Sequence, residues 1–290
     1  MRYIINGKEY TYLNNINNNK EVCKSFNELL EQTFGLTFES WEDEYIPHVL
    51  LHDNHVVANV SVNIIHTVWD KQKKLYIQLG TVMTKMDYRN QGLSRFLIEK
   101  ILEEWKPKCD AIYLFANDSV LKFYPKFGFV QENEYQYEME ITPQISSVRK
   151  LYMSNKSDIQ LLVKTYEKSN PFSALPMENN IGLIMFYCSQ FMKDSVYYIA
   201  EYDGIVIADY DDETMICYDI FCDQDISMEQ IISIVAKQNI KIVKLGFTPK
   251  LTHDYKNSLL KEDDTTLFVL AQKENIFANN KLMFSILSHA

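Results

Sequence analysis

The fold is decided by residues 79–95, which read LGTVMTKMDYRNQGLSR. Residues from Tyr76 to Met83 are mostly apolar or β-branched and predict a strand. A helix is predicted from Gly92, because apolar side chains then recur at the spacing of one buried helical face until Pro107 ends the pattern. These apolar positions are Leu93, Phe96, Leu97, Ile101 and Trp105. The stretch is therefore a strand that passes through a short loop into a helix.

The start of this helix has the features of an anion-binding site. Backbone N–H groups of a first helical turn lack partners within the helix, and the helix dipole places about half a positive charge there. Gly92 lets a ligand approach the backbone closely, and Ser94 is nearly as small. Arg89 or Arg95 would add charge-assisted hydrogen bonds to a phosphate. An ordinary turn between strand and helix fits the same residues, so the loop alone leaves both interpretations open.

The elements around this stretch predict an α/β layer structure. Residues 48–51 and 56–64 are apolar runs around a polar turn, which is typical of a β-hairpin. Residues 111–116 form a compact apolar strand, and a short helix through Phe123 and Tyr124 precedes a last strand near Tyr135–Ile141.

A similar order of elements recurs in the second half. Residues 195–201 and 205–210 predict a hairpin around Asp203-Gly204, and Thr214–Phe221 predicts a third strand. A helix from Ser227 and strands at 240–247 and 266–271 follow. The polar stretch 143–150 is the expected boundary, so we predict two domains of similar topology, at residues 1–145 and 146–290.

Two motifs resemble those of a known family. Tyr88-Arg89-Asn90-Gln91-Gly92-Leu93-Ser94 resembles the Gln/Arg-x-x-Gly-x-Gly/Ala pyrophosphate loop of the GNAT superfamily of acetyl-CoA-dependent N-acetyltransferases. Asn117, followed by Phe123-Tyr124-Pro125-Lys126-Phe127-Gly128-Phe129, resembles the downstream Asn…Phe-Tyr-x-x-x-Gly-Phe segment of that superfamily. The resemblance covers roughly residues 20–141 and implies a mixed β-sheet flanked by helices. Ser94 replaces the final Gly or Ala, a small change.

The resemblance implies a cofactor site for acetyl-CoA. Backbone groups at the end of the strand would hold the pantetheine arm, backbone amides of the loop together with Arg89 would hold the pyrophosphate, and Asn117 would bind near the pantetheine. The strand residues are Val82, Met83 and Thr84, and the loop residues are Asn90, Gln91, Gly92, Leu93, Ser94 and Arg95.

The implied reaction is transfer of an acetyl group to a primary amine of a small molecule or peptide, by direct attack on the thioester. A strand amide near Val82 would stabilise the oxyanion. Tyr124 would lie near the thioester sulfur and protonate the departing thiolate. A core aromatic is the alternative interpretation of this tyrosine, since the chain has 19 of them.

No general base stands out in the sequence. The position that matches a glutamate used by some members of the superfamily is Gln78, an amide that can orient a water but cannot take a proton. The remaining candidates are Asp43, Glu44, His48 and His66. A loop or a solvated face explains each of these better than catalysis does, so the base is left open.

Two further segments indicate where chemistry is not expected. His48, His52 and His55 straddle a predicted turn without a Cys or Glu to complete a metal site, so we expect solvated histidines and no metal. The second-half counterpart of the pyrophosphate loop, residues 221–229, has no glycine or arginine and several acidic residues that would repel a diphosphate. We expect that half to close the acceptor pocket or to form a dimer.

Composition limits the partners. The net charge of −10 is spread evenly, with 15 Lys/Arg against 20 Asp/Glu in residues 1–145 and 14 against 19 in residues 146–290. Without a basic patch, neither nucleic acid nor a membrane surface is an expected partner. An acidic cleft with the segment Trp41-Glu42-Asp43-Glu44-Tyr45 would favour a cationic amine. Five cysteines without CxxC spacing and the lack of a signal peptide or an apolar span indicate a cytoplasmic protein.

Two other functions fit part of these observations. A module that binds acyl-CoA without catalysis is compatible with the absence of an obvious base. A tandem-GNAT aminoacyl transferase that uses charged tRNA is disfavoured by the acidic charge and by the intact loop.

Overall fold

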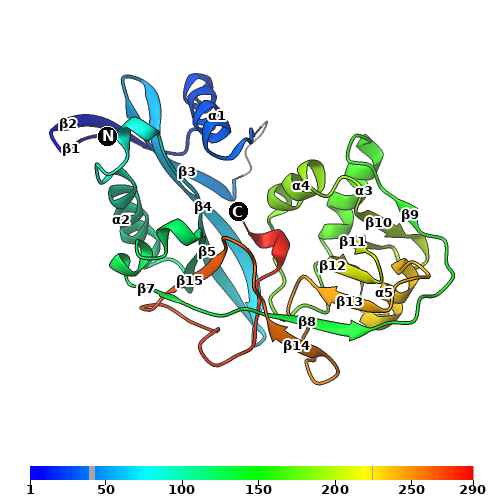
Figure 1. Cartoon of the computed structure of the whole chain (residues 1–290). Helices are drawn as coiled ribbons and strands as arrows, with labels where there is room; N and C mark the ends of the chain where they lie inside the picture. Colours follow the sequence, from blue (N-terminus) through cyan, green and yellow to red (C-terminus); the bar gives the residue numbers. More distant parts are fainter. Residues whose placement is uncertain (39–42, 224, 290) are drawn as a thin grey trace.

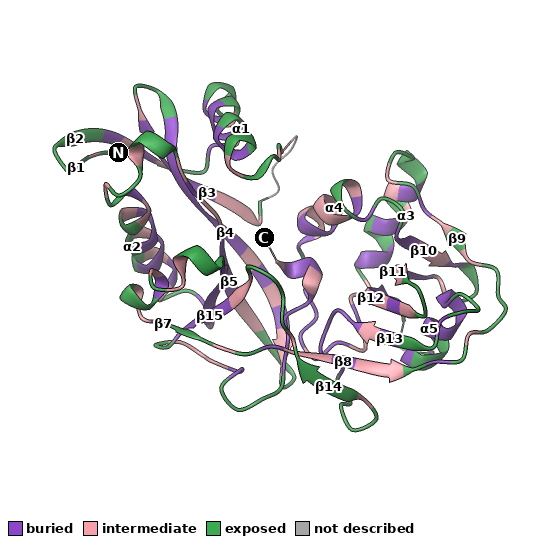
Figure 2. Ribbon diagram, in the orientation of Figure 1, coloured by how far each residue is buried: buried purple, intermediate pink, exposed green. Residues whose placement is uncertain are grey.

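The computed structural model describes residues 1–38, 43–223 and 225–289, which form two lobes side by side (Figure 1). The first lobe is built on an eight-stranded mixed sheet and the second on a seven-stranded mixed sheet, with helices packed against both. The predicted α/β class is therefore confirmed. Buried residues concentrate along the inner strands and on the inner face of the helices (Figure 2).

The first lobe follows the predicted order of elements, with additions at its N-terminus. It contains β1 (Arg2–Ile5), β2 (Lys8–Asn14), α1 (Lys20–Phe34), β3 (Tyr45–His52), β4 (His55–Trp69), β5 (Gln72–Thr84), η1 (Met86–Tyr88), α2 (Leu93–Trp105), β6 (Ala111–Ala116), η2 (Asp118–Val120), η3 (Tyr124–Phe127) and β7 (Phe129–Gln131).

The predicted hairpin of the first lobe is confirmed. Strands β3 and β4 are antiparallel and close at the pair His52 and His55. Asp53 and Asn54 between them have φ angles of 49° and 64°, in the left-handed region that tight hairpin turns require and that Asn and Asp tolerate.

The second lobe repeats this topology. Its elements are β9 (Arg149–Lys150), α3 (Lys156–Tyr166), α4 (Ile181–Gln190), β10 (Val196–Ile199), η4 (Ala200–Tyr202), β11 (Gly204–Asp211), β12 (Thr214–Phe221), α5 (Met228–Val235), β13 (Ile242–Leu245), β14 (Lys256–Leu259) and η5 (Ile286–Ser288). Strands β12 and β13 are parallel neighbours with α5 between them along the chain, as β5 and β6 are with α2.

The two lobes exchange their last strands. β8 (Tyr135–Glu140) directly follows β7, yet it lies in the second sheet between β13 and β14. β15 (Thr266–Leu270) directly follows β14, yet it lies in the first sheet between β6 and β7. The sequence predicted each strand in its own half; both assignments are wrong, because strand pairing over such distances leaves no local signal. The domain boundary between residues 145 and 146 stays a prediction. The two sheets do not respect this boundary, because each contains one strand from the other side of it.

A shared apolar core joins the lobes. It combines Tyr76 and Tyr113 of the first sheet with Leu162 of α3, Ile184 of α4 and Phe284 near the C-terminus. The ring of Phe284 stacks on Tyr113 with centroids 4.0 Å apart. The second lobe therefore covers the part of the first sheet that carries Tyr76 and Tyr113, on the face opposite α2.

Candidate active site

The first feature of the site is an open edge on β5. β5 pairs in parallel with β6 from Tyr76 and Ala111 to Leu79 and Leu114. Among the described residues, the pairing of these two strands ends there. β5 nevertheless continues to Thr84. The last five residues of β5 therefore extend past the point where its neighbour leaves it, which is the geometry that admits an extended ligand as a further strand.

A β-bulge sets this divergence. Ser61 of β4 pairs with Gly80, but Asn59 pairs with Met83, so β5 carries one residue more than β4 between these pairs. Thr81 takes up the excess with a φ angle of 48°.

Polar side chains hold the bulge in place. Asn59 Nδ2 donates to Thr81 O over 2.7 Å and to Ser61 Oγ over 2.9 Å. The hydroxyl of Tyr45 accepts from Ser61 Oγ at 2.7 Å and donates to Thr81 Oγ1 at 3.0 Å. This network was not predicted from the sequence, because its members are far apart along the chain.

The bulge also decides which backbone groups face the open edge. Lys85 donates its N–H to Val57 O on β4, and hydrogen-bonded pairs alternate along an antiparallel ladder. The backbone of Met83, two residues earlier, therefore faces β4, whereas the amides of Val82 and Thr84 face away from it. Of the three strand residues predicted to hold a ligand, Val82 and Thr84 present their backbone to the opening.

The N-terminus of α2 is the second feature. Gly92 precedes the helix with a φ angle of 81°, and Asn90 in the loop has a φ angle of 60°. Gly92 makes no side-chain capping bond, whereas the other α-helices of the described residues, α1, α3, α4 and α5, are each capped by an Asn or Ser side chain. The first-turn N–H groups of α2 are left for an anion.

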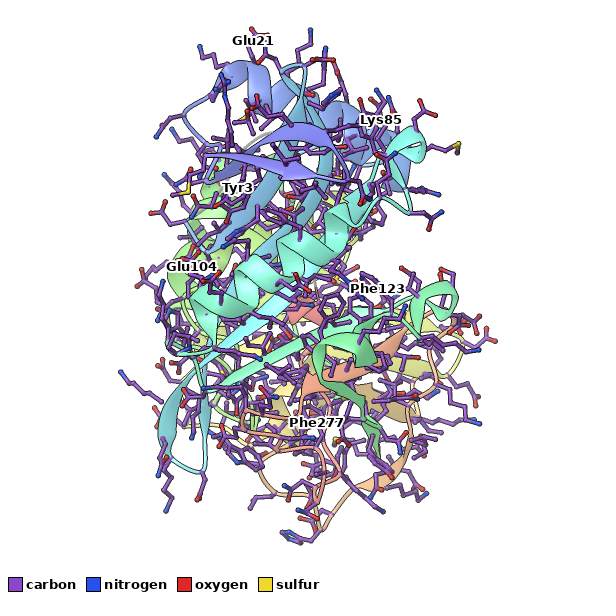
Figure 3. The ribbon with its side chains drawn as sticks, turned by 90° about the vertical axis from the view of Figure 1, so that its left-hand side faces the viewer. Tyr3, Glu21, Lys85, Glu104, Phe123 and Phe277 are labelled. Carbon is purple, nitrogen blue, oxygen red and sulfur yellow. The ribbon has the colours of Figure 1, made fainter. Side chains whose placement is uncertain are left out.

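These two features meet. Thr84 Oγ1 and Ser94 Oγ are 2.8 Å apart, and Arg89 Nε donates to Thr84 O over 3.2 Å. In Figure 3, α2 runs across the sheet from the region of Lys85 at the end of β5 toward Glu104. Arg95 is exposed in the first turn, and Leu93 is buried in the core, so Leu93 can offer only its backbone.

The β1–β2 hairpin supports the loop from the other side, which the sequence did not predict. Gln91 O accepts from Asn6 Nδ2 at 2.7 Å, and Gln91 Oε1 accepts from Tyr10 OH at 3.4 Å. Gln91 Nε2 in turn donates to Asp87 O at 2.8 Å. The predicted loop residue Gln91 therefore positions the loop through its side chain.

Asn117 lies at the end of β6, across the opening from β5. Its Nδ2 donates to Asp264 O over 3.2 Å and to Asp264 Oδ2 over 2.8 Å, and Asp118 N donates to Asp264 Oδ1 over 2.6 Å. The segment before β15 therefore fixes the orientation of this predicted binding residue.

Tyr124 is buried beneath α2 at the start of η3. Its ring centroid lies 6.3 Å from that of Phe129 and 6.0 Å from that of Phe268 on β15. Burial raises the pKa of Tyr124 to about 12, so the phenol is protonated at neutral pH. This state is the one that a proton donor needs; its predicted role stays a prediction.

The candidates for a base are dispersed. His48 is buried beside Tyr12, with His48 Nδ1 and Tyr12 OH 2.7 Å apart, and burial lowers the His48 pKa to about 4 despite Glu104 nearby. His66 bridges the second lobe through its backbone. Asp43 is exposed, and Glu44 is partly buried at the start of β3.

The expectation of solvated histidines is wrong for His48, which is 1% exposed because it lies in the middle of β3. His52 Nδ1 lies 2.9 Å from Tyr88 OH, so this histidine braces the loop, and His55 is exposed. Of the acidic segment 41–45, Trp41 and Glu42 lie outside the described residues.

Gln78 lies at the centre of a polar row. Register places Asn63 of β4, Gln78 of β5 and Tyr113 of β6 side by side across three strands. Asn63 is 2% exposed, and Gln78 is 0% exposed. The row faces the joint between the lobes, because Tyr113 packs on Phe284 there.

The joint between the lobes also contains a buried carboxyl that was not predicted from the sequence. Glu134 is 7% exposed, accepts a hydrogen bond from Phe284 N at 2.8 Å, and lines a cavity of about 220 Å³ with Glu262 and Thr266. Desolvation raises the Glu134 pKa to about 8, opposed by the Phe284 hydrogen bond and reinforced by Glu262. Only the folded chain brings the residues 134, 262 and 284 together.

The corresponding region of the second lobe is built differently. Ser227 caps α5, accepting from Gln230 N at 3.1 Å, and Asp223 pairs with Lys168 at 2.8 Å. A Cβ on Gly246 would lie 2.8 Å from Tyr218 Cα. The chain after β13 therefore stays in close contact with the chain of β12. In the first lobe, by contrast, the pairing of the corresponding strands β5 and β6 ends before β5 does. The expectation that this lobe lacks a cofactor site stays a prediction.

The strand, loop and helix predicted for residues 79–95 are present in the structure, and the helix begins without a side-chain cap. Residues 15–129 match the family model described as the acetyltransferase (GNAT) family. The predicted resemblance to the GNAT superfamily is therefore confirmed for residues 15–129.

Solved structures resemble most of the chain in fold. A probable N-acyltransferase from Enterococcus faecalis superposes with a TM-score of 0.58 at 13% identity, over 90% of this chain and 71% of that chain. Eis1 from Mycobacterium abscessus gives a TM-score of 0.56 at 13% identity, over 89% and 73%. A GCN5-related N-acetyltransferase from Kribbella flavida gives 0.53 at 11% identity, over 89% and 71%. At these identities the likeness shows the fold alone.

Two further observations concern curated proteins and membrane-spanning helices. No curated protein matches the chain. Across the residues that the structure describes, none of the helices has the length and apolar character needed to cross a membrane.

Proposed function

We propose that this protein transfers an acetyl group from acetyl-CoA to a primary amine of a small molecule or peptide. The observation that supports this most is the junction of the open β5 edge with the uncapped N-terminus of α2, tied by the Thr84–Ser94 contact. The GNAT-family domain at residues 15–129 supports acyltransferase activity. All five cysteines are free thiols, which fits a reducing compartment such as the cytoplasm.

The residues present fit the acyl donor. The outward amides of Val82 and Thr84 suit the amide groups of a pantetheine arm. The first-turn N–H groups of Leu93, Ser94 and Arg95 suit a diphosphate. When bound, acetyl-CoA supplies an activated thioester; the chain's residues provide orientation, charge stabilisation and proton transfer.

The reaction that we propose needs two contributions from the chain. The Val82 amide donates a hydrogen bond to the acetyl oxygen as negative charge grows there during attack by the amine. Tyr124 gives its proton to the sulfur as the carbon–sulfur bond breaks and the carbon–nitrogen bond forms. The surplus proton of the amine passes to water, and the tyrosine is reprotonated from solvent. The products are an N-acetylated amine and free CoA thiol.

Calorimetry on the full chain tests the donor site. Gly92 has a positive φ, and a Cβ there would meet nothing within 4 Å, so Gly92→Asn and Gly92→Asp are matched in shape and both tolerate this backbone. We expect one acetyl-CoA per chain and a loss of affinity for Gly92→Asp of about 10-fold or more relative to Gly92→Asn, because only Asp places an anion beside the diphosphate.

Equal affinity of the two variants for acetyl-CoA would show that the diphosphate does not bind at this loop. Release of CoA thiol in a screen of amines then separates an enzyme from a module that only binds acyl-CoA. Binding without thiol release to any amine would contradict the catalytic part of the proposal.

A further inference from the structure

Asn63 and Gln78 are two buried amide side chains with unsatisfied hydrogen-bonding groups. They lie opposite each other on β4 and β5. Among the described residues, Asn63 Nδ2, Gln78 Nε2 and Gln78 Oε1 have no hydrogen-bond partner. Two donors and one acceptor are therefore left without partners at adjacent positions of the sheet.

Such groups reduce the stability of the folded chain. A buried amide that forms no hydrogen bond loses its bonds to water and gains nothing in return. A leucine or methionine would fill the same space without that cost. Two adjacent positions of this kind therefore call for a partner that the chain itself does not provide.

Their location points to the acceptor. Gln78 is one residue before Leu79, where the pairing of β5 with β6 ends, and four residues before Val82, whose amide faces the open edge. The pair shares its face of the sheet with Tyr113 and therefore lies under the joint with the second lobe, opposite α2. If acetyl-CoA enters along the side of the sheet that carries α2, an amine that attacks its thioester at Val82 comes from the opposite side, where Asn63 and Gln78 lie.

We propose that Asn63 and Gln78 form the acceptor subsite and that it takes an amine with a neutral oxygen, a hydroxyl or a carbonyl, on the neighbouring carbon. This inference rests on the proposed function. Gln78 Oε1 would accept an N–H of the amine, which leaves the nitrogen lone pair free to attack. The two amide donors, Asn63 Nδ2 and Gln78 Nε2, would bind the oxygen.

The chemistry of such an acceptor suits this site. Gln78 cannot remove a proton, so the amine has to arrive uncharged. An oxygen on the neighbouring carbon withdraws electrons and lowers the amine pKa, which increases the neutral fraction near pH 8. Neither amide carries a charge, so a neutral oxygen is bound without an unpaired ion.

Three amines test the proposal on the full chain with saturating acetyl-CoA. Glycinamide and ethanolamine carry the oxygen, and ethylamine lacks it. Rates of CoA thiol release are expressed per neutral amine, so that the different amine pKa values do not decide the outcome. We expect kcat/KM for one or both oxygen-bearing amines to exceed that for ethylamine by about 100-fold or more, since a site built for a hydrogen bond rejects the analogue that lacks it. Which of the two is preferred distinguishes a carbonyl from a hydroxyl.

Variants separate recognition from structure. Gln78→Met and Asn63→Leu should remove the preference for oxygen, leave acetyl-CoA affinity unchanged, and keep or raise the thermal midpoint. Thr67→Val is the matched control: Thr67 is on the same strand and face as Asn63, is 3% exposed, and its Oγ1 also has no partner among the described residues. Thr67→Val should raise the midpoint and leave the amine preference intact.

The outcomes are distinct. If calorimetry finds no acetyl-CoA binding, the proposed function fails. If acetyl-CoA binds but the three amines react equally, or none of the three reacts while another amine of the screen does, this inference alone is overturned. A lower thermal midpoint in both Gln78→Met and Asn63→Leu with the amine preference unchanged would show a structural role and also overturn it. The comparison of the three amines uses the parent chain, so it tests the proposal even if the variants do not fold.

Discussion

Thr266 of β15 pairs with Ala116 of β6, although the two residues belong to opposite halves of the chain. The pair belongs to a reciprocal exchange in which β15 completes the first sheet and β8 completes the second. The exchange reaches the candidate site: Phe268 of β15 packs on Tyr124, and Asp264, just before β15, holds Asn117. The first sheet, next to which the candidate site lies, is therefore completed by residues from the second half of the chain.

Separated halves are predicted not to fold. Residues 1–145 lack β15, which leaves β6 and β7 without their common neighbour, and residues 146–290 lack β8. We expect each fragment alone to be insoluble or without a cooperative thermal transition. Co-expressed fragments should form a one-to-one complex with the circular dichroism of the intact chain. A cooperative transition in residues 1–145 alone would show that β15 is dispensable.

Tyr124→Phe is predicted to slow the reaction without weakening the donor site. The change removes one oxygen and keeps the contacts with Phe129 and Phe268. Loss of a general acid typically costs ~10²–10⁴ in rate, so kcat should fall by that order while acetyl-CoA affinity is retained. Tyr137→Phe, which removes a hydrogen bond to Lys281 O in the second lobe, is the control. A Tyr124→Phe kcat within about threefold of the parent would leave this residue a packing role.

The acidic segment before β3 is predicted to attract cationic amines. Asp43→Asn with Glu44→Gln should lower kcat/KM for an amine that carries a second, permanent positive charge. We expect a decrease of roughly two- to tenfold at low salt, because carboxylates near the entrance raise the local concentration of cations. The effect should shrink as salt is added. Glu213→Gln in the second lobe is the control. An unchanged kcat/KM at low salt would leave this segment a solvated loop.

Much of the fold could be predicted from local patterns in the sequence. The strand, loop and helix of residues 79–95 were predicted because the apolar and β-branched run of β5, the apolar stripe of α2 and Gly92 between them are all encoded within a few residues. Hairpins closed by Asp53-Asn54 and Asp203-Gly204 were predicted for the same reason. These parts depend on neighbours along the chain.

The elements that were not predicted depend on distant neighbours or lack a periodic pattern. Helix α4 reads IGLIMFYCSQ, an almost unbroken apolar run in which no helical stripe can be recognised. Strand β14 is exposed throughout and has no buried face to reveal it. The polar row of Asn63, Gln78 and Tyr113 requires the register of three strands. Glu134 becomes a buried group only when Phe284 packs beside it.

Glu134 is predicted to make the stability of the chain fall as pH rises. Burial raises its pKa from the ordinary value of 4.5 to about 8 in the folded chain. Between these values the unfolded chain ionises this carboxyl while the folded chain keeps it protonated. The unfolded state therefore binds fewer protons, and the free energy of unfolding decreases with increasing pH across this window. The contribution of Glu134 is fully present below about pH 4.5 and is lost as pH rises through about 8.

The comparison of Glu134→Gln with the parent isolates this contribution. Glutamine keeps an oxygen to accept the Phe284 N–H and cannot ionise. Urea unfolding at pH 5 and pH 8 should show the parent losing roughly 1–3 kcal/mol more than Glu134→Gln over that interval, within the limit of about 1.4 kcal/mol for each unit of pKa difference. Glu132→Gln, on the same cavity, should follow the parent. If the parent and Glu134→Gln lose the same free energy between the two pH values, Glu134 is ionised in the folded chain, and its burial is compensated by groups other than Phe284.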